Sequence, residues 1–172
     1  MKKKILLCIN TLGGAGAERA MLTMLRHIDP EKFDISLYVI LGQGELISEV
    51  PEYVRILNKH YEPKSVLAEE GKLALKKTVI RAAFKKGNVI RLAPYLIKNL
   101  FIMLKKKSVK PDKLLWRLLS DSAERFDEEY DIAVAYLEGG ATYYVADHIK
   151  AKTKVSFVHI NYWMAGYSRE LD

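Results

Sequence analysis

The hydrophobic residues of the chain follow two different periods, and the change from one to the other predicts alternating strands and helices. Residues 4–9 (KILLCI) form a continuous apolar run, which is typical of a strand buried on both faces of a parallel sheet. Residues 17–28 place apolar side chains at helical spacing and end at an Asp-Pro pair, so they predict an amphipathic helix. Two further strands are predicted at residues 33–41 and 54–57. This order favours a parallel sheet covered by helices.

The middle of the chain has a different pattern. Residues 64–127 lack strand alternation and are rich in Leu, Lys, Ala and Ile, which predicts two or three helices with breaks at Gly87-Asn88 and Pro111. The first pattern then returns, as a strand, a short helix and a strand over residues 131–136, 140–149 and 154–159. The predicted fold is α/β: a Rossmann-like parallel sheet with helices on both faces, plus a basic helical insertion. A sheet that ended there would lack its usual last helix and strand, so we expect one half of a larger fold.

Composition and charge narrow the class of protein. The single cysteine, Cys8, lies inside the first apolar run, which excludes a disulfide scaffold and fits a reducing compartment. No stretch reaches the roughly 18 uninterrupted apolar residues of a membrane span. Residues 72–113 contain 13 Lys or Arg and one acid, whereas the remainder holds 15 basic and 20 acidic residues. A segment of one sign usually faces a partner of the opposite sign.

Three glycines, Gly13, Gly14 and Gly16, separate the first predicted strand from the first helix. Glycines there let the backbone approach a ligand, and the helix start offers free N–H groups to a phosphate or another anion. The alternative is that they only permit the turn. A dinucleotide fingerprint is not met, because Arg19 stands where its third glycine belongs and no acid ends the second strand. The lysine of a P-loop is also lacking, so neither a nicotinamide nor an ATP site is predicted.

Polar groups follow three of the predicted strands, at Gly13–Gly16, Glu138–Gly140 and His159–Tyr162. If the strands are parallel, these tips meet at the edge of the sheet where open α/β folds bind ligands. His159 could be structural or catalytic, and Glu138 could be a substrate ligand or a solvated loop acid. Glu18 lies in the first turn of the predicted helix, where pairing with the helix dipole is the preferred interpretation. No Cys/His cluster has metal-ligand spacing, so neither a metal nor a cofactor is expected.

The segment KILLCINTLGGAGAERAMLTMLRHIDPEKFDISLYVILGQGEL, with YDIAVAYLEGGAT and KVSFVHINYW further on, closely resembles the start of family 4 glycosyltransferases of the GT-B fold. The resemblance extends over nearly all of the chain apart from the basic helices. It implies that residues 1–172 form the N-terminal, acceptor-side domain of a retaining enzyme that needs no metal. Such an enzyme moves a sugar from a nucleotide-sugar donor, most often a UDP-sugar, to a glycan or lipid-linked acceptor. A C-terminal domain grips most of the donor, so these residues alone are expected to be inactive or nearly so.

The resemblance also implies roles for individual residues. His159 matches a histidine placed near the transferred sugar, as a hydrogen-bonding and electrostatic helper. Many members have an acid soon after that histidine, where this chain has Asn161, which makes an acid/base role for the position doubtful. The expected substrate-binding residues, from the rim and the resemblance together, are Gly13, Gly14, Ala15, Gly16, Glu138, Gly139, Asn161 and Tyr162.

The basic segment, residues 72–113, mixes Lys and Arg with Leu, Ile, Phe and Met and leaves two interpretations open. It could form helices with a solvated lysine face, or a surface that lies on an anionic membrane. The family favours the second, because many members act on lipid-linked acceptors at the inner face of a bacterial membrane, in surface-polysaccharide biosynthesis. A cytoplasmic protein, peripheral on that face, is therefore expected. No nucleic-acid partner is predicted, since few aromatics and no binding motif accompany the charges. The alternative function is a noncatalytic α/β module that binds an anionic ligand or a membrane surface.

Overall fold

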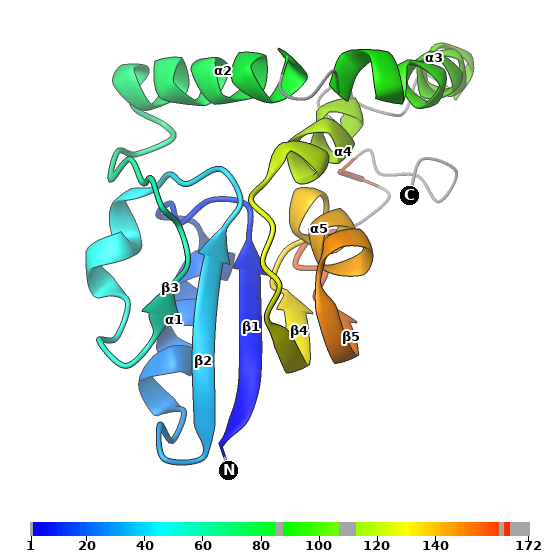
Figure 1. Cartoon of the computed structure of the whole chain (residues 1–172). Helices are drawn as coiled ribbons and strands as arrows, with labels where there is room; N and C mark the ends of the chain where they lie inside the picture. The colour runs from blue at the N-terminus through cyan, green and yellow to red at the C-terminus, as the bar shows by residue number, and fades with distance from the viewer. Residues whose placement is uncertain (1, 85–87, 107–112, 162–163, 166–172) are drawn as a thin grey trace.

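Five parallel strands form a single sheet in the order β3-β2-β1-β4-β5 (Figure 1). The computed structural model describes residues 2–84, 88–106, 113–161 and 164–165. Strand β1 (Lys3–Ile9) is central and pairs with β2 (Phe33–Val39) and β4 (Glu129–Ala135), while β3 (Arg55–Ile56) and β5 (Lys150–Ser156) form the two edges. The prediction of a Rossmann-like α/β fold with a parallel sheet is confirmed. Because every pair is parallel, the carboxyl ends of all five strands share one edge.

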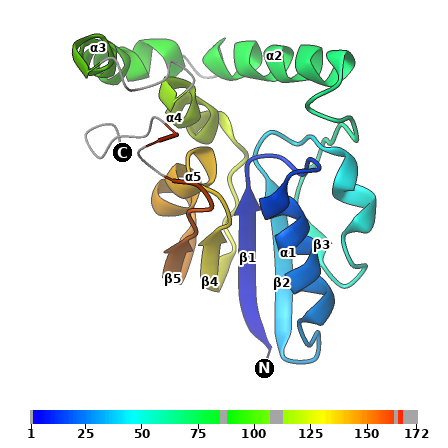
Figure 2. The ribbon, with the colours of Figure 1, turned by 180° about the vertical axis from the view of Figure 1, so that it is seen from behind.

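Helices cover both faces of this sheet. Helix α1 (Gly16–His27) and the short 3-10 helix η1 (Glu45–Glu49) pack on one face, and α5 (Gly140–His148) packs on the other. Figure 2, seen from behind, brings α1 in front of the sheet. On β1, Leu7 and Ile9 face α1, whereas Leu6 and Cys8 belong to the core beneath α5. Burial on both faces is the reason that this strand is an unbroken apolar run.

Residues 64–127 contain three helices, as predicted: α2 (Glu69–Phe84), α3 (Asn88–Lys106) and α4 (Lys113–Ser122). Helix α4 contacts α5, and α2 and α3 contact α4, so that α2 and α3 form a layer beyond the carboxyl edge of the sheet (Figure 1). A small cluster of Leu41, Ala82 and Leu119 joins α2 and α4 to the end of β2. Of the predicted breaks, Gly87 and Pro111 lie outside the described residues.

The predicted position of the last strand is wrong. Strand β5 runs from Lys150 to Ser156, earlier than residues 154–159, because it pairs with β4 from Glu129↔Lys150 to Ala135↔Ser156. As an edge strand it is exposed along most of its length and alternates lysine with small residues, so it lacks the apolar run of a buried strand. His159 therefore lies in the loop beyond the strand.

Candidate functional site

The segments that follow β1, β4 and β5 leave the sheet side by side at its carboxyl edge. The backbone N–H of Tyr136 donates to the carbonyl of Cys8 at 2.7 Å, and that of Phe157 donates to the carbonyl of Ala135 at 2.9 Å. These bonds extend the parallel pairing past the ends of the strands. The loops that follow β1, β4 and β5 therefore lie at the same edge of the sheet, as predicted. We call the groups on this edge, around Gly13–Gly16, Glu138–Gly140 and His159, the rim site.

Asn10 joins the first two tips of the rim site. The residue is only 7% exposed; its Nδ2 donates to the carbonyl of Glu138 at 3.0 Å, and its Oδ1 accepts the backbone N–H of Ala141 at 2.8 Å. One amide thus binds the loop after β4 and the first turn of α5. Sequence reasoning missed Asn10, although a polar residue directly after an apolar strand was a usable signal.

Two glycines in the loop after β4 are explained by this arrangement. Gly139 has φ +82°, a left-handed conformation that strongly favours glycine. A methyl group on Gly140 would lie 2.9 Å from Asn10 Oδ1 and 2.9 Å from Trp116 Cε3, closer than packed atoms allow. The glycine pair of LEGGAT therefore has a structural reason, independent of any ligand.

Glu138 joins the second tip to the third. The residue is 8% exposed, and its Oε2 accepts the backbone N–H of His159 at 3.1 Å. The imidazole ring of His159 stacks on Tyr136, with ring centroids 5.2 Å apart and an angle of 28° between the planes. Of the two interpretations of Glu138, a solvated loop acid does not fit its burial. The exposed His159 is held through both its backbone and its ring.

The glycine loop lies at the same edge, between β1 and α1. Gly13 is buried, while Gly14, Ala15 and Gly16 are exposed. None of the three glycines has a positive φ, so the backbone conformation alone does not require them. A methyl group on Gly13 or Gly14 would meet Val66 or Glu45 at 3.3–3.4 Å, whereas one on Gly16 would have no heavy atom within 4 Å. The space above Gly16, at the start of α1, is open.

Glu18, on the first turn of α1, is 5% exposed and points into this region. Its carboxylate is hydrogen-bonded to the side chain of Thr11 and to its own backbone N–H. Burial raises the pKa of Glu18; the negative charge of nearby Glu45 adds to this, and the two hydrogen bonds and His159 oppose it. Pairing with the helix start was predicted, but burial was not. Glu18 shares the i, i+3, i+4 face of Met21 and Leu22, and this spacing was the signal that the acid faces inward.

Glu45 adds a second carboxylate beside the loop. Its Oε1 lies 3.3 Å from the position of a methyl group on Gly14, and its Oε2 is buried without a hydrogen-bond partner in the described part of the chain. A positive charge lies close by, because Arg19 Nε donates to the carbonyl of Gly14 at 3.3 Å. The loop therefore offers backbone N–H groups and hydrogen-bond acceptors together, a combination suited to a ligand with both phosphate and hydroxyl groups.

The remaining predicted residues follow His159. Asn161 is exposed, and its Oδ1 accepts the backbone N–H of Met164 at 3.1 Å, so its side chain closes a turn. Tyr162 lies outside the described residues. Among the residues that the structure describes, no three His, Cys, Asp or Glu side chains gather as metal ligands.

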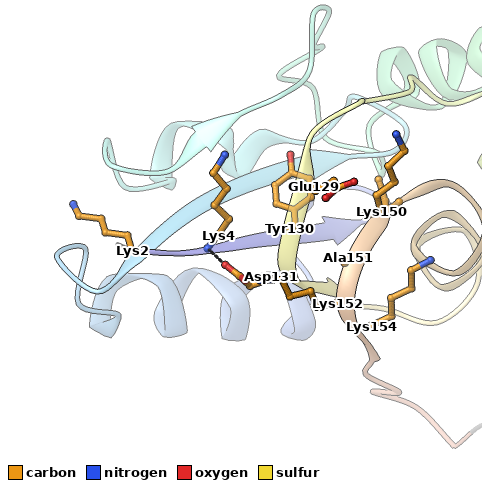
Figure 3. A pocket seen from close by; sticks show the side chains of 10 residues that line it. Lys2, Lys4, Glu129, Tyr130, Asp131, Lys150, Ala151, Lys152 and Lys154 are labelled. Atoms are coloured by element: carbon orange, nitrogen blue, oxygen red, sulfur yellow. Dashed lines mark hydrogen bonds and ion pairs between the residues drawn. The ribbon is translucent and has the colours of Figure 1, made fainter.

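A depression of about 640 Å³ lies at the opposite edge of the sheet, around the amino ends of β1, β4 and β5 (Figure 3). Lysines dominate its lining, but Asp131 accepts the backbone N–H of Lys4 at 3.0 Å and pairs with Lys152 at 2.6 Å. These exposed pairs have little energetic weight, and ligands of open α/β sheets bind at the carboxyl edge. We therefore assign no site to this depression.

The exposed faces of α2 and α3, which we call the α2–α3 surface, combine apolar and basic side chains. On α3, the exposed side chains of Ile90, Ile97, Phe101 and Leu104 recur at helical spacing and form one apolar stripe. Helix α2 exposes Leu73, Ile80 and Phe84. Six basic side chains of these two helices are described, and all are exposed: Lys72, Lys76, Lys77, Arg81, Lys98 and Lys105. Within the described ranges, no helix has the length and apolar character to cross a bilayer.

Comparisons of the chain with protein-family models, with curated proteins and with solved structures find no match. The rim site, the α2–α3 surface and the sequence resemblance are therefore the features that bear on function.

Proposed function

We propose that this chain is the acceptor-side domain of a retaining GT-B glycosyltransferase that transfers a sugar from a nucleotide-sugar, such as a UDP-sugar, to a glycan or lipid-linked acceptor. The observation that carries the proposal is the open space at Gly16, on the same rim as the exposed ring of His159. One edge of the sheet thus presents a helix start free for an anion and an imidazole free for a polar ligand. Glu18 lies within electrostatic reach of His159, which links the two parts of the site.

In this proposal the residues act as binding and orienting groups. The backbone N–H groups near Gly16 face the donor diphosphate or the acceptor, and His159 hydrogen-bonds beside the transferred sugar. The bond from the sugar to the diphosphate breaks while the acceptor oxygen bonds to the same sugar carbon on the same face. The acceptor proton leaves with the nucleoside diphosphate. Glu18 and Glu45 oppose tight binding of a diphosphate by this domain alone, in keeping with a donor grip supplied by a second domain.

A transfer assay tests the proposal. The complete reading frame that contains these residues is incubated with radiolabelled UDP-sugars and a bacterial lipid extract, and label is counted in the lipid fraction. We expect transfer, and we expect His159→Ala to lower turnover about a hundredfold, as the loss of a charge-stabilising donor does. His27→Ala, which removes an exposed histidine at the opposite end of α1 from Gly16, is the control. If His159→Ala leaves turnover intact, the role of His159 is wrong. If no nucleotide-sugar is used as a donor, a noncatalytic module that binds an anionic ligand or a membrane surface becomes the better hypothesis.

We also propose that the α2–α3 surface holds the protein on an anionic membrane, the inner face of the cell membrane, where lipid-linked acceptors lie. The support is the combination of an exposed apolar stripe on α3 with basic side chains beside it. Each Lys or Arg near an anionic surface contributes about 1 kcal/mol of attraction, and apolar side chains that enter the lipid add to it. Such binding is reversible and weakens in salt.

A further inference from the structure

The hydrogen bonds of Asn10 and Glu138 form a continuous series across the rim site. Asn10 Nδ2 donates to the carbonyl of Glu138, and the carboxylate of the same Glu138 accepts the backbone N–H of His159. Asn10 and Glu138 are both buried, so the bond between them is shielded from competing water, whereas the bond to the exposed His159 is partly buried. The loop that carries His159 is thereby tied to the end of the central strand.

We propose that Asn10 is a positioning residue for His159 and acts through Glu138. Because Asn10 fixes the carbonyl of Glu138 and the first turn of α5, it fixes the backbone from which the Glu138 carboxylate reaches His159. Gly140 completes the arrangement, since any side chain there would displace the amide of Asn10. This role rests on the proposed function only in so far as His159 serves sugar transfer; the positioning itself needs no substrate.

The chain contains a matched control for this idea. Asn58 Nδ2 donates to the carbonyl of Val39 at 2.7 Å, and its Oδ1 accepts the N–H of Val39 at 2.9 Å. Asn58 therefore makes one bond of each kind to the backbone, as Asn10 does, but at the end of β2. If Asn10 were only a structural brace, Asn10→Ala and Asn58→Ala would have equivalent consequences at His159.

The experiment uses NMR on the chain alone, with no sugar donor. In Asn10→Ala we expect the backbone amide of His159 to exchange with solvent about fivefold to tenfold faster, as the loss of its hydrogen bond to Glu138 implies. The ring resonances of His159 should also move, because they lose the ring current of Tyr136. Asn58→Ala should leave both readouts near the wild-type values. If Asn10→Ala does not fold, Asn10→Asp retains the volume but cannot donate to Glu138, and the same changes are expected.

Two results would overturn the positioning role: unchanged His159 signals in the folded Asn10 variant, or equal changes in Asn58→Ala. The outcome is separable from that of the transfer assay. Displaced His159 signals together with an active His159→Ala enzyme would refute the catalytic proposal and keep the positioning role. In an active enzyme, Asn10→Ala should lower turnover about tenfold to a hundredfold with little change in KM, since a misplaced group affects the reacting geometry.

Discussion

The backbone N–H of His159 donates to the carboxylate of Glu138 across 3.1 Å, and this bond joins the loop after β5 to the loop after β4. Because Glu138 is buried, few water molecules can compete with His159 for its carboxyl oxygen. The ring of His159 consequently lies over Tyr136 at the carboxyl edge, where the glycine loop also ends.

Substitution of Gly16 by alanine should separate function from stability. The position is helical, and its methyl group would have no protein atom within 4 Å, so Gly16→Ala should leave stability unchanged or raise it by up to about 1 kcal/mol. If a ligand approaches the helix start, the same methyl group should weaken transfer severalfold. Thermal unfolding and the transfer assay provide the two measurements. Thr23→Ala, exposed further along α1, is the control; equal transfer by both variants would contradict a ligand contact at Gly16.

Gly140→Ala, unlike Gly16→Ala, should destabilise the folded protein. Its methyl group would lie 2.9 Å from both Asn10 Oδ1 and Trp116 Cε3, so the variant is overpacked and should lose about 1–3 kcal/mol of unfolding free energy. Urea unfolding followed by circular dichroism measures this loss. A Gly140→Ala protein as stable as wild type would show that the Asn10 amide can shift without cost.

Glu18 should make stability depend on pH. Its folded-state pKa is raised above the ordinary value of 4.5, chiefly by burial, so the folded state binds a proton more readily than the unfolded state. The contribution of this group to stability is therefore fully present below about pH 4. It is lost as the pH rises through the raised pKa. Glu18→Gln cannot ionise, so we expect it to be more stable than wild type at neutral pH, with the difference shrinking in acid.

The measurement for Glu18 is the midpoint of urea unfolding across this pH range. Glu31→Gln, an exposed acid, serves as the control and should track the wild type. A wild-type advantage over Glu18→Gln at neutral pH would mean that the ionised carboxylate is satisfied in the folded protein, contrary to the raised pKa.

The α2–α3 surface should bind anionic vesicles in a charge-dependent way. We expect the protein to sediment with vesicles that contain phosphatidylglycerol and to remain in solution with phosphatidylcholine alone. Reversal of two lysines on α3, Lys98→Glu with Lys105→Glu, should lower the affinity by about tenfold or more, because each lysine contributes about 1 kcal/mol near the surface. The control pair, Lys3→Glu with Lys150→Glu, makes the same change of net charge at the amino edge of the sheet. Equal losses in both pairs would indicate attraction by net charge rather than by this surface.

The positions of the loops at the rim site could largely be predicted from local sequence patterns, whereas the buried hydrogen bonds that join them could not. The apolar run of β1 and the glycine loop identified the carboxyl edge, and the tips at Glu138 and His159 followed from the parallel order. The role of Asn10 depends on a partner 128 residues away, which no local pattern reveals. Strand β5 was placed too late for a similar reason: an exposed edge strand is defined by its pairing with β4, and its lysines hide it from a search for apolar runs.

The sequence by itself determined the class of fold, because strands buried on both faces and amphipathic helices each leave a period that follows from backbone geometry. It also located the glycine loop and the basic segment, since both are compositional. Only the tertiary structure decided which polar groups became buried partners: Asn10 with Glu138, Glu138 with His159, and Glu18 beneath the loop. Those choices depend on the strand order and on the face that each helix turns to the sheet. Both are set by long-range packing of the whole chain rather than by neighbouring residues.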